Sequence, residues 1–104
     1  MSAAKADTAT TGDIERVLLD LARARGPRKT ICPSEVSRAL AGKDEKAWRL
    51  LMQPVKRVAT RLAREGRVEL RRKGRPVDPD ALRGIYRIAI APAHANPDTT
   101  NGDQ

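Results

Sequence analysis

A helical spacing of hydrophobic residues marks the middle of the chain. Val55, Val58 and Leu62 recur at i, i+3 and i+7, which predicts an amphipathic helix from Pro54 to Glu65. The proline is placed first because it disfavours helical angles in the residue before it. Gly66 follows directly, at the position where a glycine commonly ends a helix.

The hydrophobic spacing changes to that of a β-strand after this glycine. Within residues 67–73, Val68 and Leu70 point to one side of a strand, and the polar residues between them point to the other. Residues 85–90 alternate in the same way and predict a second strand. A turn over residues 74–80, stiffened by two prolines, joins the two strands into a hairpin.

Two further helices are predicted upstream. The first is capped by Thr11 or Asp13 and is stopped by Gly26, and the second runs from Pro33 to a stop at Gly42. Residues 29–31 are short and β-branched enough to form a small strand between them. The apolar face of the first helix consists of Ile14, Val17, Leu18 and Leu21, and that of the second helix consists of Val36, Ala39 and Leu40.

A polar connector leads from the second helix to the third. Asp44 is expected to cap a short turn that carries Trp48, although one kinked helix from residue 44 to residue 65 is an open alternative. Trp48 is expected to anchor the core because an indole buries a large apolar area. Cys32 is expected to be a small buried hydrophobe.

Together these elements predict an α+β fold that is mostly helical. A chain of 104 residues holds one domain, here placed at residues 13–90. Three helices plus a small antiparallel sheet with a two-stranded wing are typical of a winged helix-turn-helix. Residues 1–12 and 91–104 lack a periodic apolar pattern and are expected to be disordered tails.

Three separated segments carry a family resemblance. They read I-C-P-S-E-V-S-R-A-L (31–40), W-R-L-L-M-Q-P-V-K-R-V-A-T-R-L-A-R-E-G (48–66) and K-G-R-P-V-D-P (73–79). In these segments, from about residue 13 to residue 90, the chain resembles the bacterial family called domain of unknown function 3253. The resemblance implies a winged-helix fold, and it implies no activity, ligand or catalytic residue.

The charge of the chain is strongly positive and unevenly placed. The net charge is +8, and the segment from Arg49 to Arg87 holds 12 Lys and Arg against 4 Asp and Glu. This asymmetry favours an anionic partner, most simply nucleic acid, on the C-terminal half. The chain has one Trp, one Tyr and no Phe, which argues against stacking of single-stranded bases.

The positive residues fall on two predicted surfaces. The polar face of the third helix is expected to enter the groove of double-stranded DNA and consists of Gln53, Lys56, Arg57, Thr60, Arg61 and Arg64. The wing is expected to contact phosphates through Arg71, Arg72, Lys73 and Arg75. The sequence therefore predicts a DNA-binding protein, such as a transcriptional regulator. A module that binds an acidic protein, structured RNA as the partner, and charges that only solvate the surface are alternatives left open.

Other functional classes have little support in the sequence. No nucleophile–base set, phosphate-binding loop or metalloprotease motif is present, so no enzyme activity, catalytic residue or cofactor is predicted. His94 has no partners at metal-ligand spacing, and no metal site is expected. No segment resembles a membrane span or a signal peptide, which predicts a cytoplasmic protein without a membrane partner. The oligomeric state, including any contact through Leu19, is left open.

Overall fold

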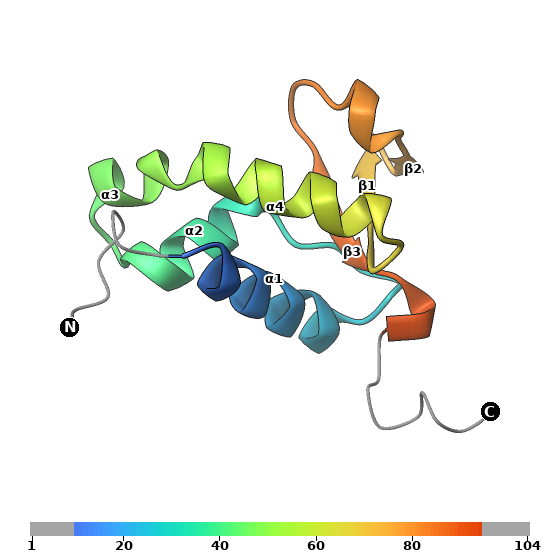
Figure 1. Cartoon of the computed structure of the whole chain (residues 1–104), viewed down its shortest axis with the longest axis horizontal. Helices are drawn as coiled ribbons and strands as arrows, with labels where there is room; N and C mark the ends of the chain where they lie inside the picture. The colour runs from blue at the N-terminus through green and yellow to red at the C-terminus, as the bar shows by residue number, and fades with distance from the viewer. Residues whose placement is uncertain (1–9, 95–104) are drawn as a thin grey trace.

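Four helices and three short strands form in residues 10–94, the part of the chain that this computed structural model describes (Figure 1). The helices are α1 (Thr11–Arg25), α2 (Pro33–Ala41), α3 (Glu45–Leu50) and α4 (Met52–Arg64). The strands are β1 (Val68–Arg72), β2 (Arg75–Pro76) and β3 (Arg87–Ile90), and short 3-10 turns are η2 (Pro79–Ala81) and η3 (Pro92–His94). This arrangement confirms the mostly helical α+β class. Most of the predicted tails, residues 1–9 and 95–104, lies outside the described residues.

Helix α1 is capped by Thr10, one residue before Thr11 and three before Asp13, the two caps that the sequence predicts. The Thr10 hydroxyl accepts a hydrogen bond from the Asp13 backbone N–H at 3.1 Å. In return, the Asp13 carboxylate accepts one from the Thr10 N–H at 3.1 Å. Each side chain satisfies a backbone donor that the helix leaves free, which is the capping-box arrangement. The prediction of Thr11 or Asp13 as the cap is therefore wrong, whereas the stop at Gly26, with φ +85°, is confirmed.

Helix α2 has the predicted start at Pro33 and the predicted stop before Gly42. Its buried face differs from the prediction, because Ala39 is exposed and Ser37 is buried. The Ser37 hydroxyl donates a hydrogen bond to the Met52 sulfur at 3.3 Å. A buried polar group thus finds a partner, and the contact links α2 to the start of α4.

The short turn predicted after Asp44 is a helix, α3, which Asp44 caps as expected, and only Leu51 separates it from α4. Leu51 keeps angles near the helical region (φ −85°, ψ −10°), so α3 leads almost directly into the N-terminal end of α4 (Figure 1). Helix α4 starts at Met52, two residues before the predicted start. Pro54 lies within its first turn, where a missing N–H removes no helical hydrogen bond.

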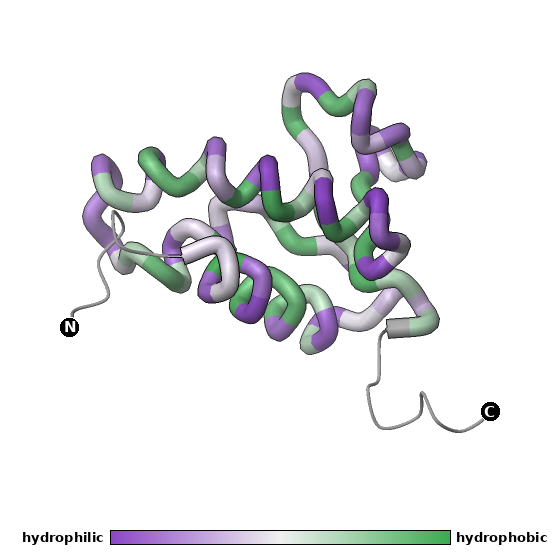
Figure 2. The backbone as a smooth tube through the Cα atoms, viewed as in Figure 1, coloured by the Kyte–Doolittle hydropathy of each residue, from purple (hydrophilic) through white to green (hydrophobic). Residues whose placement is uncertain are grey.

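The core lies between α4, α1, α2 and one face of the sheet. The apolar stripe of α4 is buried as predicted and consists of Val55, Val58, Ala59 and Leu62. Figure 2 shows hydrophobic residues on the side of α4 toward α1 and hydrophilic residues on its outer side. Leu19 is buried in this core, so its side chain is not part of the outer surface of α1.

Two residues that were expected in the core lie elsewhere. Trp48 is only partly buried, and it packs against arginines on the surface rather than in the core. Cys32 is half-buried at the cap position of α2, where its sulfur accepts a hydrogen bond from the Ser34 hydroxyl at 3.1 Å. Both side chains contact polar groups, which a prediction from hydrophobicity alone does not take into account.

The sheet is antiparallel, with strand order β2-β1-β3. Strand β1 pairs with β3 over four residues, from Val68 opposite Ile90 to Arg71 opposite Arg87. Both strands are shorter than predicted. The predicted strand at residues 29–31 is reduced to a single bridge between Ile31 and Ile88, next to β3.

Candidate nucleic-acid interface

The outer face of α4 carries a row of polar side chains along its length. At about 100° per residue, Gln53, Arg57, Thr60 and Arg64 lie on the side opposite the buried stripe. With Lys56 these four residues line an open depression of about 400 Å³. The structure therefore brings together five of the six helix residues that the sequence places at the interface.

Arg61 is the sixth of these residues, and it lies beside α1 instead. Its guanidinium donates to Glu15 at 2.6 Å and to Glu65 at 3.0 Å. Arg67 donates to the second oxygen of Glu15 at 2.9 Å. Hydrogen bonds from Arg61 and then Arg67 hold the pKa of the Glu15 carboxyl below its ordinary value. Arg61 is therefore committed to an ion-pair network that joins α1 to α4.

Arg64 is exposed but also has a carboxylate partner. Its guanidinium donates two hydrogen bonds to Asp80 in η2, through Nε at 2.8 Å and through a terminal nitrogen. Asp78 caps η2 by accepting from the Asp80 backbone N–H at 2.9 Å. The loop after β2 thus folds back onto the C-terminal end of α4, and the ion pair closes this corner. An exposed pair of this kind contributes little stability, so an anion in solution can compete with Asp80.

The cationic residues in the middle of α4 have no such partners. Within residues 10–94, no carboxylate and no hydrogen-bond acceptor contacts Lys56 or Arg57. Both side chains are free to bind an anion without first leaving a protein partner. The unpaired part of the helix face is therefore its N-terminal two thirds.

The hairpin of β1 and β2 divides into a free tip and an engaged base. Arg71 donates to Glu69 at 2.6 Å and to the Pro27 carbonyl at 3.3 Å, and Arg72 donates to the Ile85 carbonyl at 3.3 Å. At the tip, β1 and β2 pair across a two-residue turn formed by residues 73 and 74. The exposed side chains of the tip, Lys73 and Arg75, have no partner among the described residues.

The carboxylates that engage these arginines were not all predicted from the sequence. Glu65 and Glu69 lie close in the chain to the arginines that they pair with, Arg61 and Arg71, so the local sequence already suggests these pairs. Glu15 is 46 residues from Arg61, and no local pattern connects them. Asp80 is 16 residues from Arg64, and it lies in the turn predicted over residues 74–80.

The chain matches a known protein family over a range that includes both the outer face of α4 and the β1–β2 hairpin. A family model matches residues 11–91, which include every helix and strand from α1 to β3. The chain belongs to the family described as Protein of unknown function (DUF3253). No curated protein matches the chain. The DUF3253 description assigns no activity.

Two kinds of feature are absent from the described part of the DUF3253 domain. Across residues 10–94, no three His, Cys, Asp or Glu side chains come together in a way that could hold a metal ion. No helix in that range is long and apolar enough to cross a membrane.

Proposed function

We propose that this DUF3253 domain is a winged helix that binds double-stranded DNA. In this proposal, α4 lies in the major groove and the β1–β2 hairpin contacts a flanking phosphate. The observation that carries the proposal is a set of unpaired cations on α4 and at the hairpin tip, in a domain where eight of the other thirteen described arginines have carboxylate partners. Unpaired cations on one surface raise its positive potential and attract a polyanion.

The order of elements supports the winged-helix assignment. A helix, a bridge strand at Ile31, two helical segments and a hairpin follow one another, and the bridge lies next to β3, which pairs with β1. In winged helices the last helix before the hairpin is the one that reads the groove, and here that helix is α4. The additional short helix α3 takes the place of a tight turn between the two helices of the motif.

The dimensions and chemistry of α4 suit a major groove. A helix of 13 residues is about 20 Å long and about 10–12 Å wide with its side chains, and the major groove is about 12 Å wide. Arg57 can donate two hydrogen bonds to guanine, and the Gln53 amide can pair with adenine in the same way. Lys56 and the hairpin tip would supply sequence-independent phosphate contacts.

A salt titration with a random-sequence duplex of about 20 base pairs tests the proposal. The double variant Lys56→Ala/Arg57→Ala should bind more weakly, and the slope of log K against log salt should fall in magnitude by about 1.8 if both residues contact phosphates. The matched control is Arg16→Ala/Arg23→Ala, which removes the same charge from α1. The proposal is wrong if the wild-type protein does not bind the duplex at low salt, or if both double variants lose the same affinity.

An acidic protein is the second candidate partner, and one observation favours it. Ile85 is 85% exposed, and its carbonyl accepts the hydrogen bond from Arg72 at the base of the hairpin. An exposed apolar side chain at the base of a basic hairpin suits a peptide better than a phosphate backbone. Poly-glutamate in the same titration separates the two candidates. Binding of the polypeptide without binding of the duplex would support the protein partner.

A further inference from the structure

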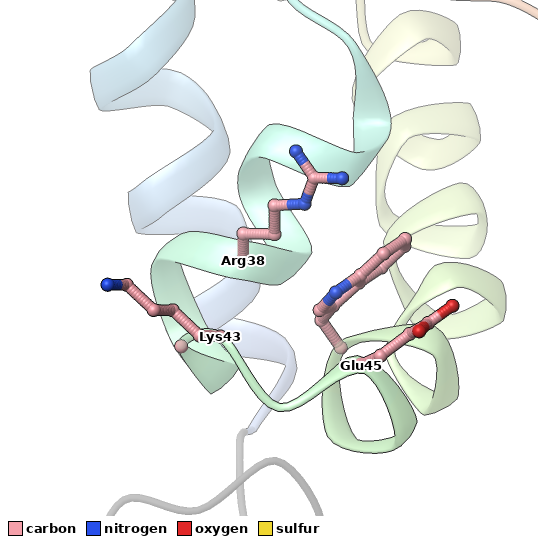
Figure 3. A pocket seen from close by; sticks show the side chains of 5 residues that line it. Arg38, Lys43 and Glu45 are labelled. Atoms are coloured by element: carbon pink, nitrogen blue, oxygen red, sulfur yellow. The ribbon is translucent and has the colours of Figure 1, made fainter.

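A pocket of about 610 Å³ lies between α2 and α3, away from both surfaces described above (Figure 3). It is lined by Arg38, Gly42, Lys43, Glu45 and Trp48. The guanidinium carbon of Arg38 lies 4.7 Å from the centre of the Trp48 ring, which is cation–π distance. The only tryptophan of the chain therefore holds an arginine on the surface.

The side chains that line this pocket carry a net positive charge. Its single carboxylate, Glu45, is engaged by Arg49 at 2.5 Å. In the described part of the chain, neither Arg38 nor Lys43 has a carboxylate or hydrogen-bond partner. Two cations therefore face solvent around the pocket without compensation, which favours an anionic ligand.

The contact with Trp48 prepares Arg38 for one kind of anion. The contact with Trp48 places the guanidinium carbon of Arg38 over the ring, and no described residue accepts a hydrogen bond from its N–H donors. A planar fork that is held in place loses less conformational freedom on binding, and its two parallel donors match the oxygens of a phosphate. The geometry therefore suits a phosphate group better than a single carbonyl oxygen.

The pocket lies at the end of α4 that is farther from the hairpin. Helix α3, which carries Trp48, continues through Leu51 into α4, and the hairpin lies near the opposite end of α4 (Figure 1). A helix in the major groove has a phosphate strand on each side of it. We propose that Arg38, held by Trp48, and Lys43 bind a backbone phosphate on the side of the groove opposite the hairpin. This inference rests on the proposed DNA-binding function.

Fluorescence of Trp48 during a salt-dependent titration tests this second phosphate site directly, because the chain has no other tryptophan. Addition of a random duplex of about 20 base pairs should change the emission of the wild-type protein, and added salt should reverse the change. Arg38→Ala should weaken binding on the order of fivefold to tenfold at 0.1 M salt and lower the magnitude of the salt slope by about 0.9. Lys43→Ala should act in the same direction. Arg38→Lys should restore part of the affinity, since it keeps the charge but loses the fork.

The control is Arg16→Ala, which removes one exposed helical guanidinium from α1. Equal salt slopes for Arg38→Ala, Lys43→Ala and Arg16→Ala would overturn the second site. The proposed function would still stand if Lys56→Ala/Arg57→Ala weakened binding in that case. A wild-type protein that does not bind the duplex would overturn both proposals. A change in Trp48 emission with poly-glutamate but not with the duplex would also overturn this one.

Discussion

Arg57 and Arg61 lie one turn apart on α4, yet their surroundings give them different roles. Arg61 is held by Glu15 at 2.6 Å and by Glu65 at 3.0 Å, whereas Arg57 has no carboxylate partner among the described residues. To bind a phosphate, Arg57 exchanges only water, and Arg61 has to leave two carboxylates. A charge pattern along a helix therefore overstates the number of residues that are available to a ligand.

Separate measurements of stability and binding should distinguish the two arginines. Arg61→Ala should lower the free energy of unfolding by about 1 kcal/mol, because it removes two partly exposed ion pairs. Arg57→Ala should change stability by less than about 0.5 kcal/mol, as is usual for surface positions, and should weaken duplex binding. Urea denaturation and a duplex titration of both variants provide the readouts. An equal loss of affinity for the two variants would show that Arg61 also takes part in the interface.

Helical spacing correctly predicted which residues lie on the outer face of α4. It did not predict which of their side chains are engaged in ion pairs. The spacing placed Gln53, Arg57 and Thr60 on one side because that placement depends on residues within the helix. The engagement of Arg61 and Arg64 depends on Glu15 and Asp80, which only the tertiary fold brings near.

The β1–β2 hairpin has a strained residue at its tip. Lys73 (φ +53°) and Gly74 (φ +79°) both occupy the left-handed region, as a two-residue hairpin turn requires. Glycine adopts this conformation freely, but for a lysine it costs roughly 1–2 kcal/mol. Asparagine or glycine is the usual residue at the position of Lys73. A strained lysine with no partner among the described residues is consistent with a role in binding.

Replacing this lysine should therefore change stability and binding in opposite directions. Lys73→Asn should raise the free energy of unfolding by about 1 kcal/mol, since asparagine tolerates the left-handed region. The same change should lower the magnitude of the salt slope for duplex binding by about 0.9, because one phosphate contact is lost. Arg75→Gln is the control, with the same loss of charge and no gain in stability. Unchanged duplex affinity in Lys73→Asn would remove the hairpin tip from the interface.

At the level of elements, hydrophobic spacing and glycines predicted the helices and strands, and most errors concern their ends. The predicted start of the third helix at Pro54 gave too much weight to the proline, which the first turn of α4 accommodates. The turn was predicted over residues 74–80, but the chain turns within residues 73 and 74, because β2 pairs with β1 directly after them. Both differences arise from backbone pairing and packing that the local residue pattern does not contain.

Ion pairs connect the main parts of the molecule around α4. Glu15 of α1 binds Arg61 of α4 and Arg67 just before β1, and Asp80 of η2 binds Arg64 at the end of α4. These contacts fix the helix against α1, the sheet and the return loop. Engaged arginines thus position α4, and the unpaired cations beside them remain available for a partner.

The Glu15 network should make stability depend on pH in the acid range. The pKa of Glu15 is lowered from its ordinary value of 4.5, first by the hydrogen bond from Arg61 and next by that from Arg67. Because the folded pKa lies below the unfolded one, the contribution is complete well above pH 4.5 and is lost as the pH falls through the folded pKa. Glu15→Gln should therefore lower the free energy of unfolding by about 1 kcal/mol at neutral pH, and the difference from wild type should shrink in acid. Urea denaturation across the acid range measures this, with Glu45→Gln, which breaks an exposed pair within α3, as the control. A constant difference between Glu15→Gln and wild type at all pH values would mean that the carboxylate charge does not hold α1 to α4.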